Sequence, residues 1–290
     1  MRFAFVKANA GDHAGAFPVA VACRVLGVSR CGYYAWLKRP TPRRGSGKEF
    51  LMKEIASAHA ASRQLYGSPR VHAELAAGGV AACVNTVAKY MREAGIRSAT
   101  HRRFRVRTTD SNHGYPVAPN VLARDFTAAA PDEKWAVDVT YVMTGEGWLY
   151  VAAVLDLCTR KVVGWAMADH LRSELCEAAL RMAVVHRRPG TGLVHHADRG
   201  VQYCCHAYRA LLERAGMVCS MSGVGDCWDN AAMESFWSTL KRELVYLTEF
   251  ATRSEAEASI FEFVEVFYNR ERRHSSLGYL SPEAYEATLP

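Results

Sequence analysis

The sequence lacks the features that mark secreted, disulfide-bonded or membrane proteins. Its nine cysteines are odd in number and include no C-x-x-C pair, so no disulfide framework is indicated. The longest apolar run, Trp148 to Leu155, is far shorter than the ~20 residues of a membrane span. The N-terminal apolar run, Phe3 to Val6, is too short for a signal peptide. We therefore expect a cytoplasmic protein with no membrane attachment.

Repeats are missing as well. There is no internal repeat and no low-complexity tract, and no predicted helix runs three heptads with apolar a and d positions. A chain of 290 residues, half of them apolar, is long enough for two or three domains. The sequence therefore predicts several ordinary globular parts and no coiled coil.

Charge is distributed unevenly along the chain. The net charge of +7 combines +13 in residues 1–110 (19 Lys and Arg against 6 Asp and Glu) with −6 in the remainder (17 against 23). A basic front part joined to an acidic back part suggests a polyanion-binding module attached to a part that uses carboxylates. A solvated basic surface is the alternative.

The basic part reads as short helices. We expect two within residues 17–39, the second capped by Ser29, then a basic Pro/Gly linker at 40–47 and a helix over 48–62. Helices over 70–77 and 83–94, joined at a Gly-Gly turn, form a plausible helix-turn-helix, although hairpins with basic faces are common. The candidate DNA contacts are Asn85, Lys89 and Arg92 on the second helix and Arg102, Arg103, Arg105 and Arg107 in the tract after it.

Beyond a loosely ordered connector the pattern changes to strands. The expected order is β-β-β-α-β-α-β-α, with strands at 135–143, 148–157, 161–168, 192–197 and 217–221 and helices at 173–187, 203–215 and 231–247. Ser173 is expected to cap the first of these helices. This order predicts an α/β fold, a mixed five-stranded sheet flanked by helices as in the ribonuclease-H-like arrangement. The predicted parts are a helical segment with linker (1–47), a helix-turn-helix-like region (48–107), a connector (108–132), a catalytic core (133–250) and a C-terminal helix with a basic tail (251–290).

Three carboxylates stand at notable positions in this order. Asp138 lies inside the first strand, Asp198 closes the fourth strand, and Glu234 follows 35 residues later in the first turn of the last helix. A carboxylate within an apolar strand is costly unless it is paired or metal-bound, and a cap or an ion pair is the structural alternative. Three oxygen ligands suit Mg²⁺, and two such ions can drive an in-line displacement at phosphorus.

Several stretches resemble the catalytic-frame transposases of the insertion sequence 3 family, within the integrase-like Asp-Asp-Glu recombinases. The matching stretches are Trp135–Tyr141, His196–Tyr203, Gly225–Phe236, Ser238–Glu243, Tyr268–Pro282, Leu65–Arg70 and Val25–Arg30. The departures are small: Ala197 and Trp228 stand where family members often have Ser and Tyr. The resemblance covers nearly the whole chain.

The resemblance implies an integrase-type catalytic core that cleaves DNA and transfers strands at the ends of an insertion sequence. Asp138, Asp198 and Glu234 would bind two Mg²⁺ ions, for which Mn²⁺ can substitute. Lys241, on the helical face of Glu234, would hold the transposon end, while the stripe of Phe236, Leu240, Leu244 and Leu247 would pack inward. Arg199 and Asn230 would contact DNA and His196 would support the site, although a structural role is as plausible for each. The implied partners are duplex DNA of terminal inverted repeats and target, further copies of the chain on DNA, and an upstream-frame product supplied by fusion.

Two other functions remain open at this stage. One is a catalytically inactive DNA-binding repressor derived from such an element, and the other is a nuclease that cuts RNA in hybrids. Asp156 and Asp169 fall at strand ends, where turn chemistry explains them. The cluster His195, His196, Cys204, Cys205 and His206 has no zinc-ligand spacing, so we expect no zinc.

Overall fold

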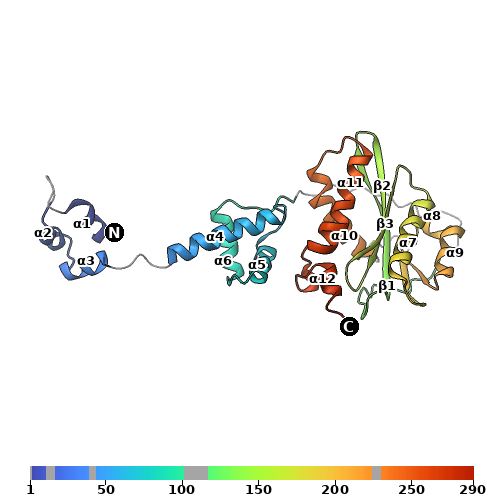
Figure 1. Ribbon diagram of the computed structural model, residues 1–290, viewed down its shortest axis with the longest axis horizontal. Helices are drawn as coiled ribbons and strands as arrows, with labels where there is room; N and C mark the ends of the chain where they lie inside the picture. Colours follow the sequence, from blue (N-terminus) through green and yellow to red (C-terminus); the bar gives the residue numbers. More distant parts are fainter. Residues whose placement is uncertain (1, 11–16, 39–43, 101–116, 224–229) are drawn as a thin grey trace. The chain divides into compact units, whose positions relative to one another are not determined.

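The computed structural model describes residues 2–10, 17–38, 44–100, 117–223 and 230–290 (Figure 1). The chain divides into two compact units, residues 1–57 and 58–290. Arg102, Arg103, Arg105 and Arg107 lie outside the described residues.

The first unit contains three short helices, α1 (Arg2–Asn9), α2 (Val19–Val25) and α3 (Arg30–Leu37). They bury a small core that includes Val6, Cys23 and Tyr33. The Ser29 hydroxyl accepts a hydrogen bond from the Gly32 amide at 3.0 Å, which confirms the predicted cap of α3. The sequence did not predict α1. Helix α4 (Arg44–Ala61) starts in this unit.

Two helices form a tight pair at the start of the second unit. They are α5 (Ser68–Ala77) and α6 (Val84–Glu93), joined through Gly79, whose φ of +77° favours glycine. Val71 and Leu75 on α5 and Val87 on α6 are buried, while the polar side of α6 faces solvent. The predicted helix-turn-helix-like pair is therefore present.

A five-stranded mixed sheet organises the rest of this unit. Its strands are β1 (Lys134–Thr144), β2 (Gly147–Asp156), β3 (Val162–Ala168), β4 (Val194–Ala197) and β5 (Val218–Met221), in the spatial order β3-β2-β1-β4-β5. The first three pair antiparallel, whereas β4 pairs parallel with both β1 and β5. The first and fourth strands are neighbours, as predicted.

Helices cover both faces of the sheet (Figure 1). Helices α7 (Ser173–Arg187) and α9 (His206–Arg214) pack on one face, over a core that includes Trp135 and Val137. Helices α10 (Ala231–Glu243) and α11 (Arg253–Glu262) pack on the other. Because side chains alternate along a strand, residues 136, 138 and 140 of β1 face α10 and α11.

Three local predictions were wrong. Arg172, not Ser173, is the N-cap of α7, because Ser173 is already the first helical residue. The single helix expected over 203–215 is two, α8 (Val201–Cys204) and α9, since Cys205 has extended backbone with ψ of 152°. Helix α10 ends at Glu243, and Leu247 lies in a separate 3₁₀ turn, η2 (Val245–Leu247), with 43% of its surface exposed, so it does not pack inward.

The C-terminal part is packed against the sheet and is not a free basic tail. Helix α11 continues as a π-helix, η3 (Phe263–Glu271), followed by a 3₁₀ turn, η4 (Ser275–Leu277), and α12 (Pro282–Glu286). The Asn269 amide accepts a hydrogen bond from the Val162 N–H at 2.9 Å and donates one to the Val162 carbonyl at 3.0 Å, so η3 is fixed to β3. Among the described residues, no helix has the length and apolarity that a membrane crossing requires.

Candidate active site

Asp138 and Asp198 lie at the same end of two neighbouring parallel strands. The last paired residues of β1 and β4 are Ala136 and His196. Each aspartate lies two residues beyond its member of that pair, so the two carboxylates occur at equivalent positions on adjacent backbones. Successive strands in a sheet are about 4.8 Å apart, which is close enough for two carboxylates to share a cation.

Two donors fix the Asp138 carboxylate. The Val139 amide donates to Oδ1 at 2.8 Å, and the indole Nε1 of Trp237, on α10, donates to Oδ2 at 3.1 Å. Burial, then the negative charge of Asp198 and more weakly that of Glu234, raise the pKa of Asp138 to about 7, while both hydrogen bonds act to lower it. Asp138 therefore lies in the electrostatic field of both other predicted acids.

The turn after β4 holds Asp198. The Gly200 amide donates to Asp198 Oδ1 at 2.9 Å. A Cβ on Gly200 would lie 2.8 Å from Gln202 Oε1 and 3.0 Å from that same Asp198 oxygen, so a larger residue would crowd both side chains. Arg199 donates from Nε to the Ser222 carbonyl at 2.6 Å, which fixes this turn to the chain beyond β5.

Glu234 is carried by a helix that is anchored to β1. It lies in the first turn of α10 and is exposed. Trp237, one turn later, makes the hydrogen bond to Asp138, and buried Asn230, the N-cap residue, donates from Nδ2 to the Val137 carbonyl at 3.3 Å. Both contacts hold the start of α10 beside the strand that carries Asp138.

Lys241 lies farther along α10 and is half-buried. Its Nζ is 5.2 Å from the centroid of the Tyr141 ring, on β1. Burial lowers the pKa of Lys241, and the charge of Asp138 opposes this. A lysine partly removed from water on the helix of Glu234 is suited to contact an anion there.

The two histidines beside Asp198 have structural partners. His196 is fully buried, and its ring nitrogens lie 2.9 Å from the Ser220 hydroxyl and 3.2 Å from the Ser222 hydroxyl. His195 is hydrogen-bonded to the Tyr208 hydroxyl at 2.9 Å. His196 thus connects β4 to β5 and to the residue after β5, close to the turn that carries Asp198.

A metal ion bound here would be held by carboxylate oxygens. In the described part of the chain, no three His, Cys, Asp or Glu side chains are gathered into a ready metal cage. The donor set is nevertheless the one a hard cation prefers, and each Asp138 oxygen accepts one hydrogen bond and keeps a second lone pair. A cation would also relieve the repulsion that Asp138 experiences from Asp198 and Glu234. The chemistry of these carboxylates therefore fits divalent ions, and Glu234 is exposed to solvent.

Other predicted residues lie elsewhere. Asn85, Lys89 and Arg92 are exposed on α6, and Lys89 is 3.9 Å from Glu93. Asp156 is fully buried and accepts hydrogen bonds from the Thr159 amide and hydroxyl, both at 2.8 Å, so its role in the turn is confirmed.

Sequence reasoning missed Trp237 and Gly200 as site residues. No role was predicted for Trp237. Its spacing of three residues from Glu234 was the available signal, because residues at that spacing are neighbours on a helix. Gly200 stands two residues after Asp198, where a backbone N–H can turn back onto an aspartate side chain.

Comparison with known proteins agrees with this architecture. Residues 128–227 and 215–282 each match a family described as integrase core domain, and residues 47–104 match one described as HTH-like domain. An insertion element IS600 uncharacterized 31 kDa protein of Shigella sonnei is 46% identical over 263 residues, 91% of this chain and 96% of that protein. Transposase InsF for insertion sequence IS3A of Escherichia coli (strain K12) is 40% identical over 288 residues, 99% of this chain and 98% of that protein.

Solved structures are more distant. A simian T-cell lymphotropic virus intasome in complex with PP2A regulatory subunit B56 gamma is 13% identical with a TM-score of 0.47, covering 80% of this chain and 74% of that one. The HTLV-2 integrase catalytic core domain in complex with magnesium is 12% identical with a TM-score of 0.41, covering 55% of this chain and 99% of that one.

The sheet order and the two core matches define an integrase-core enzyme of the polynucleotidyl-transferase type. With full-length relatives at 40% identity, the chain belongs to the insertion sequence 3 family of transposases.

Proposed function

We propose that Asp138, Asp198 and Glu234 hold the divalent ions with which this transposase cleaves and joins DNA at the ends of an insertion sequence. One observation carries the proposal. Asp138 and Asp198 lie at the same end of neighbouring parallel strands, and the helix that carries Glu234 is hydrogen-bonded to Asp138 through Trp237. When bound, two Mg²⁺ ions ~3.5–4 Å apart, or Mn²⁺ in their place, would activate the attacking hydroxyl and stabilise the leaving oxygen.

The protein's own groups orient these ligands. Trp237 and the Val139 amide fix the Asp138 carboxylate, and the Gly200 amide fixes that of Asp198. Glu234 is exposed at the start of α10, so it is accessible to a duplex end. Such supporting hydrogen bonds set the orientation of metal ligands.

DNA contacts are proposed on both sides of the connector. Lys241, Arg199 and Asn230 are proposed contacts near the acids. The helix-turn-helix-like pair is proposed to contact DNA through three residues on the exposed side of α6: Asn85, Lys89 and Arg92. The arginines of residues 102–107 are proposed to contact the phosphate backbone. The ligand is duplex DNA, of the terminal inverted repeats and of the target, in the bacterial cytoplasm.

Joining two ends requires more than one protomer held in register. The longest α-helix in the described part of the chain, α4, has 18 residues, which is fewer than three heptads. We propose that the chain acts as a homo-oligomer on DNA, with an upstream-frame product, fused to it, supplying further dimerisation and end binding.

The test replaces each acid by its amide. Asp138→Asn, Asp198→Asn and Glu234→Gln should each abolish Mg²⁺-dependent cleavage and strand transfer on element-end DNA, and binding in a band-shift assay should remain. Asp169→Asn, at an exposed position outside the site, is the matched control and should keep activity. Near wild-type joining by any one of the three amide variants would contradict the assignment. DNA binding without cleavage by the unaltered chain, both alone and fused to the upstream-frame product, would favour a repressor.

A further inference from the structure

Two sequence stretches with no role at the carboxylates meet in the second unit. They are residues 65–70, before α5, and residues 268–282, at the chain's end. The Tyr66 hydroxyl accepts a hydrogen bond from the Arg273 amide at 2.8 Å, and Arg273 forms an ion pair with Glu74 on α5. Arg63 binds Glu262 through two hydrogen bonds, one of them 2.8 Å long. The helix-turn-helix-like segment is thus fastened to the C-terminal helices by several contacts.

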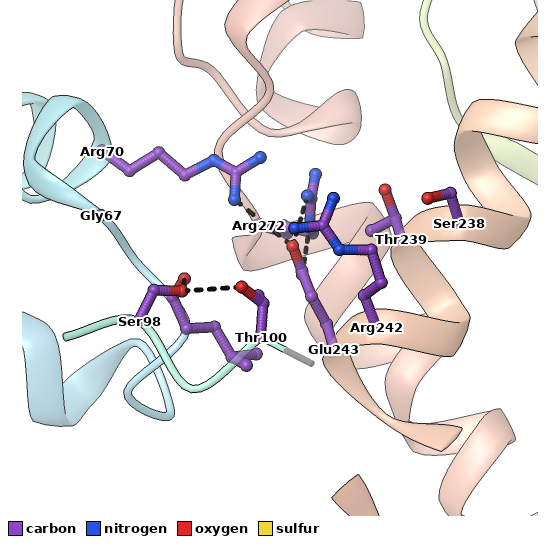
Figure 2. A pocket seen from close by; sticks show the side chains of 10 residues that line it. Gly67, Arg70, Ser98, Thr100, Ser238, Thr239, Arg242, Glu243 and Arg272 are labelled. Atoms are coloured by element: carbon purple, nitrogen blue, oxygen red, sulfur yellow. Dashed lines mark hydrogen bonds and ion pairs between the residues drawn. The ribbon is translucent and has the colours of Figure 1, made fainter. Parts of the chain in front are cut away.

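A polar pocket of about 300 Å³ lies where these stretches meet the end of α10 (Figure 2). Its volume is roughly ten times the ~30 Å³ that a water molecule occupies in the liquid. Three arginines, Arg70, Arg242 and Arg272, and the hydroxyls of Ser98 and Ser238 line it. In Figure 2, Arg70 and Arg242 extend toward the same space from opposite sides. Arginine and serine are among the residues whose side chains contact DNA phosphates.

The pocket carries a surplus of positive charge. Its one carboxylate, Glu243, is already bound by Arg272 through two hydrogen bonds of 2.7 Å, and Arg70 approaches it at 3.4 Å. Arg242 is exposed and has no ion-pair partner among the described residues. Three guanidinium groups against one carboxylate leave a net charge of +2, which favours an anionic ligand.

The pocket lies along the face of α10 that begins at Glu234. Ser238 and Arg242 follow Glu234 by four and eight residues, so they lie about 6 and 12 Å from it along the helix axis. Because consecutive phosphates of one strand rise by about 3.4 Å along duplex DNA, a phosphate in the pocket would lie roughly two to four nucleotides from the acids.

We propose that this pocket holds a backbone phosphate of the DNA strand whose end is processed at Asp138, Asp198 and Glu234. The inference rests on the proposed function and deepens it. Arg70 belongs to the helix-turn-helix-like segment, whereas Arg242 and Arg272 belong to the core and the C-terminal part. A phosphate bound by Arg70 and Arg242, beside the buried Arg272–Glu243 ion pair, therefore links recognition of the end to its position at the acids.

The test measures the affinity of the full chain for two duplexes of equal length, one with the element's end and one unrelated, over a range of salt concentrations. Arg242→Ala should reduce the slope of log affinity against log salt by about 0.9 on both duplexes, because one phosphate contact is lost. Arg214→Ala removes the same charge from an exposed position on α9 and should leave the slope unchanged. Both variants should keep the unfolding temperature of the unaltered chain.

A second pair of variants adds a charge. Ser238→Asp places a carboxylate in the pocket wall at an exposed position and should weaken binding, whereas Ser254→Asp, exposed on α11, should not. The pocket proposal is overturned if Arg242→Ala and Arg214→Ala have the same salt slope and if Ser238→Asp and Ser254→Asp bind DNA with the same affinity. This holds even where the unaltered chain binds and cleaves DNA. Arg242-dependent binding without Mg²⁺-dependent cleavage, also when the chain is fused to the upstream-frame product, would support the phosphate site and overturn the proposed catalytic function. An unfolding temperature raised by inorganic phosphate only when Arg242 is present, with unchanged DNA slopes, would identify a small-anion site and overturn the DNA assignment.

Discussion

Trp237→Phe removes the indole donor to Asp138 and keeps an aromatic ring in the buried position. Trp237 Nε1 donates to Asp138 Oδ2 at 3.1 Å. A hydrogen bond to a charged acceptor contributes ~1.5–3 kcal/mol, and ~1.4 kcal/mol corresponds to a factor of ten. Removing this bond should therefore weaken the affinity for Mg²⁺ about 10- to 150-fold. The Val139 amide still fixes Oδ1, which favours the lower part of that range.

The assay titrates Mg²⁺ at constant enzyme and DNA and measures the initial rate of end cleavage. Because Trp237 positions a metal ligand and touches no substrate, the Mg²⁺ concentration at half-maximal rate should rise about 10- to 100-fold, and saturating metal should restore much of the rate. DNA affinity without metal should not change.

Trp165→Phe is the matched control. Trp165 Nε1 donates to Glu265 Oε1 at 2.7 Å, so this variant also removes an indole–carboxylate hydrogen bond, between β3 and η3. It should lower the free energy of unfolding by ~1 kcal/mol or more, with no effect on the Mg²⁺ midpoint. Equal Mg²⁺ midpoints for Trp237→Phe and the unaltered chain would refute the positioning role.

Three further outcomes are expected. Lys241→Ala, which removes the ammonium 5.2 Å from the Tyr141 ring centroid, should impair end joining more than general DNA binding; equal losses would show an ordinary surface lysine. Gly164→Ala should lower the free energy of unfolding in urea by ~1–3 kcal/mol, because its Cβ would meet the Ala179 carbonyl and lie 2.7 Å from the Ala183 amide on α7. Gly190→Ala, with open space around the new Cβ, should change it little, and a similar loss at both sites would contradict the packing argument. A fusion with the upstream-frame product should form paired-end complexes in a band-shift and end-joining assay far better than this chain alone; efficient pairing by the isolated chain would place the dimerisation surface within its 290 residues.

The sheet could be predicted from the sequence because its strands are long, apolar and separated by turn residues. All five strands occur where the pattern places them, within two residues at either end. The positions of the acids followed from the strand order, since Asp138 and Asp198 lie on neighbours in the sheet. The resemblance to the transposase family is confirmed by relatives that match nearly the whole chain.

What the sequence could not reveal depends on long-range contacts. Nothing local in residues 263–271 indicates a π-helix; its wider turn accompanies the binding of Asn269 to β3, more than a hundred residues earlier. The sequence places Arg272 in a basic tail. Its ion-pair partner Glu243 lies 29 residues earlier, so no local pattern indicates the pair. The break at Cys205 was hidden because neighbouring residues continue a helical pattern. The domain boundaries and the roles of the acids stay predictions.

The binding of Asn269 to Val162 also limits how copies of the protein can associate. β3 is an edge strand, and exposed backbone groups on such strands can template strand addition by another chain. Here the amide of one side chain occupies both the N–H and the carbonyl of Val162, as a partner strand would. At this end of β3 the sheet cannot grow by β-augmentation. Strand addition by another chain is therefore blocked at Val162, which removes one position at which this edge could seed aggregation.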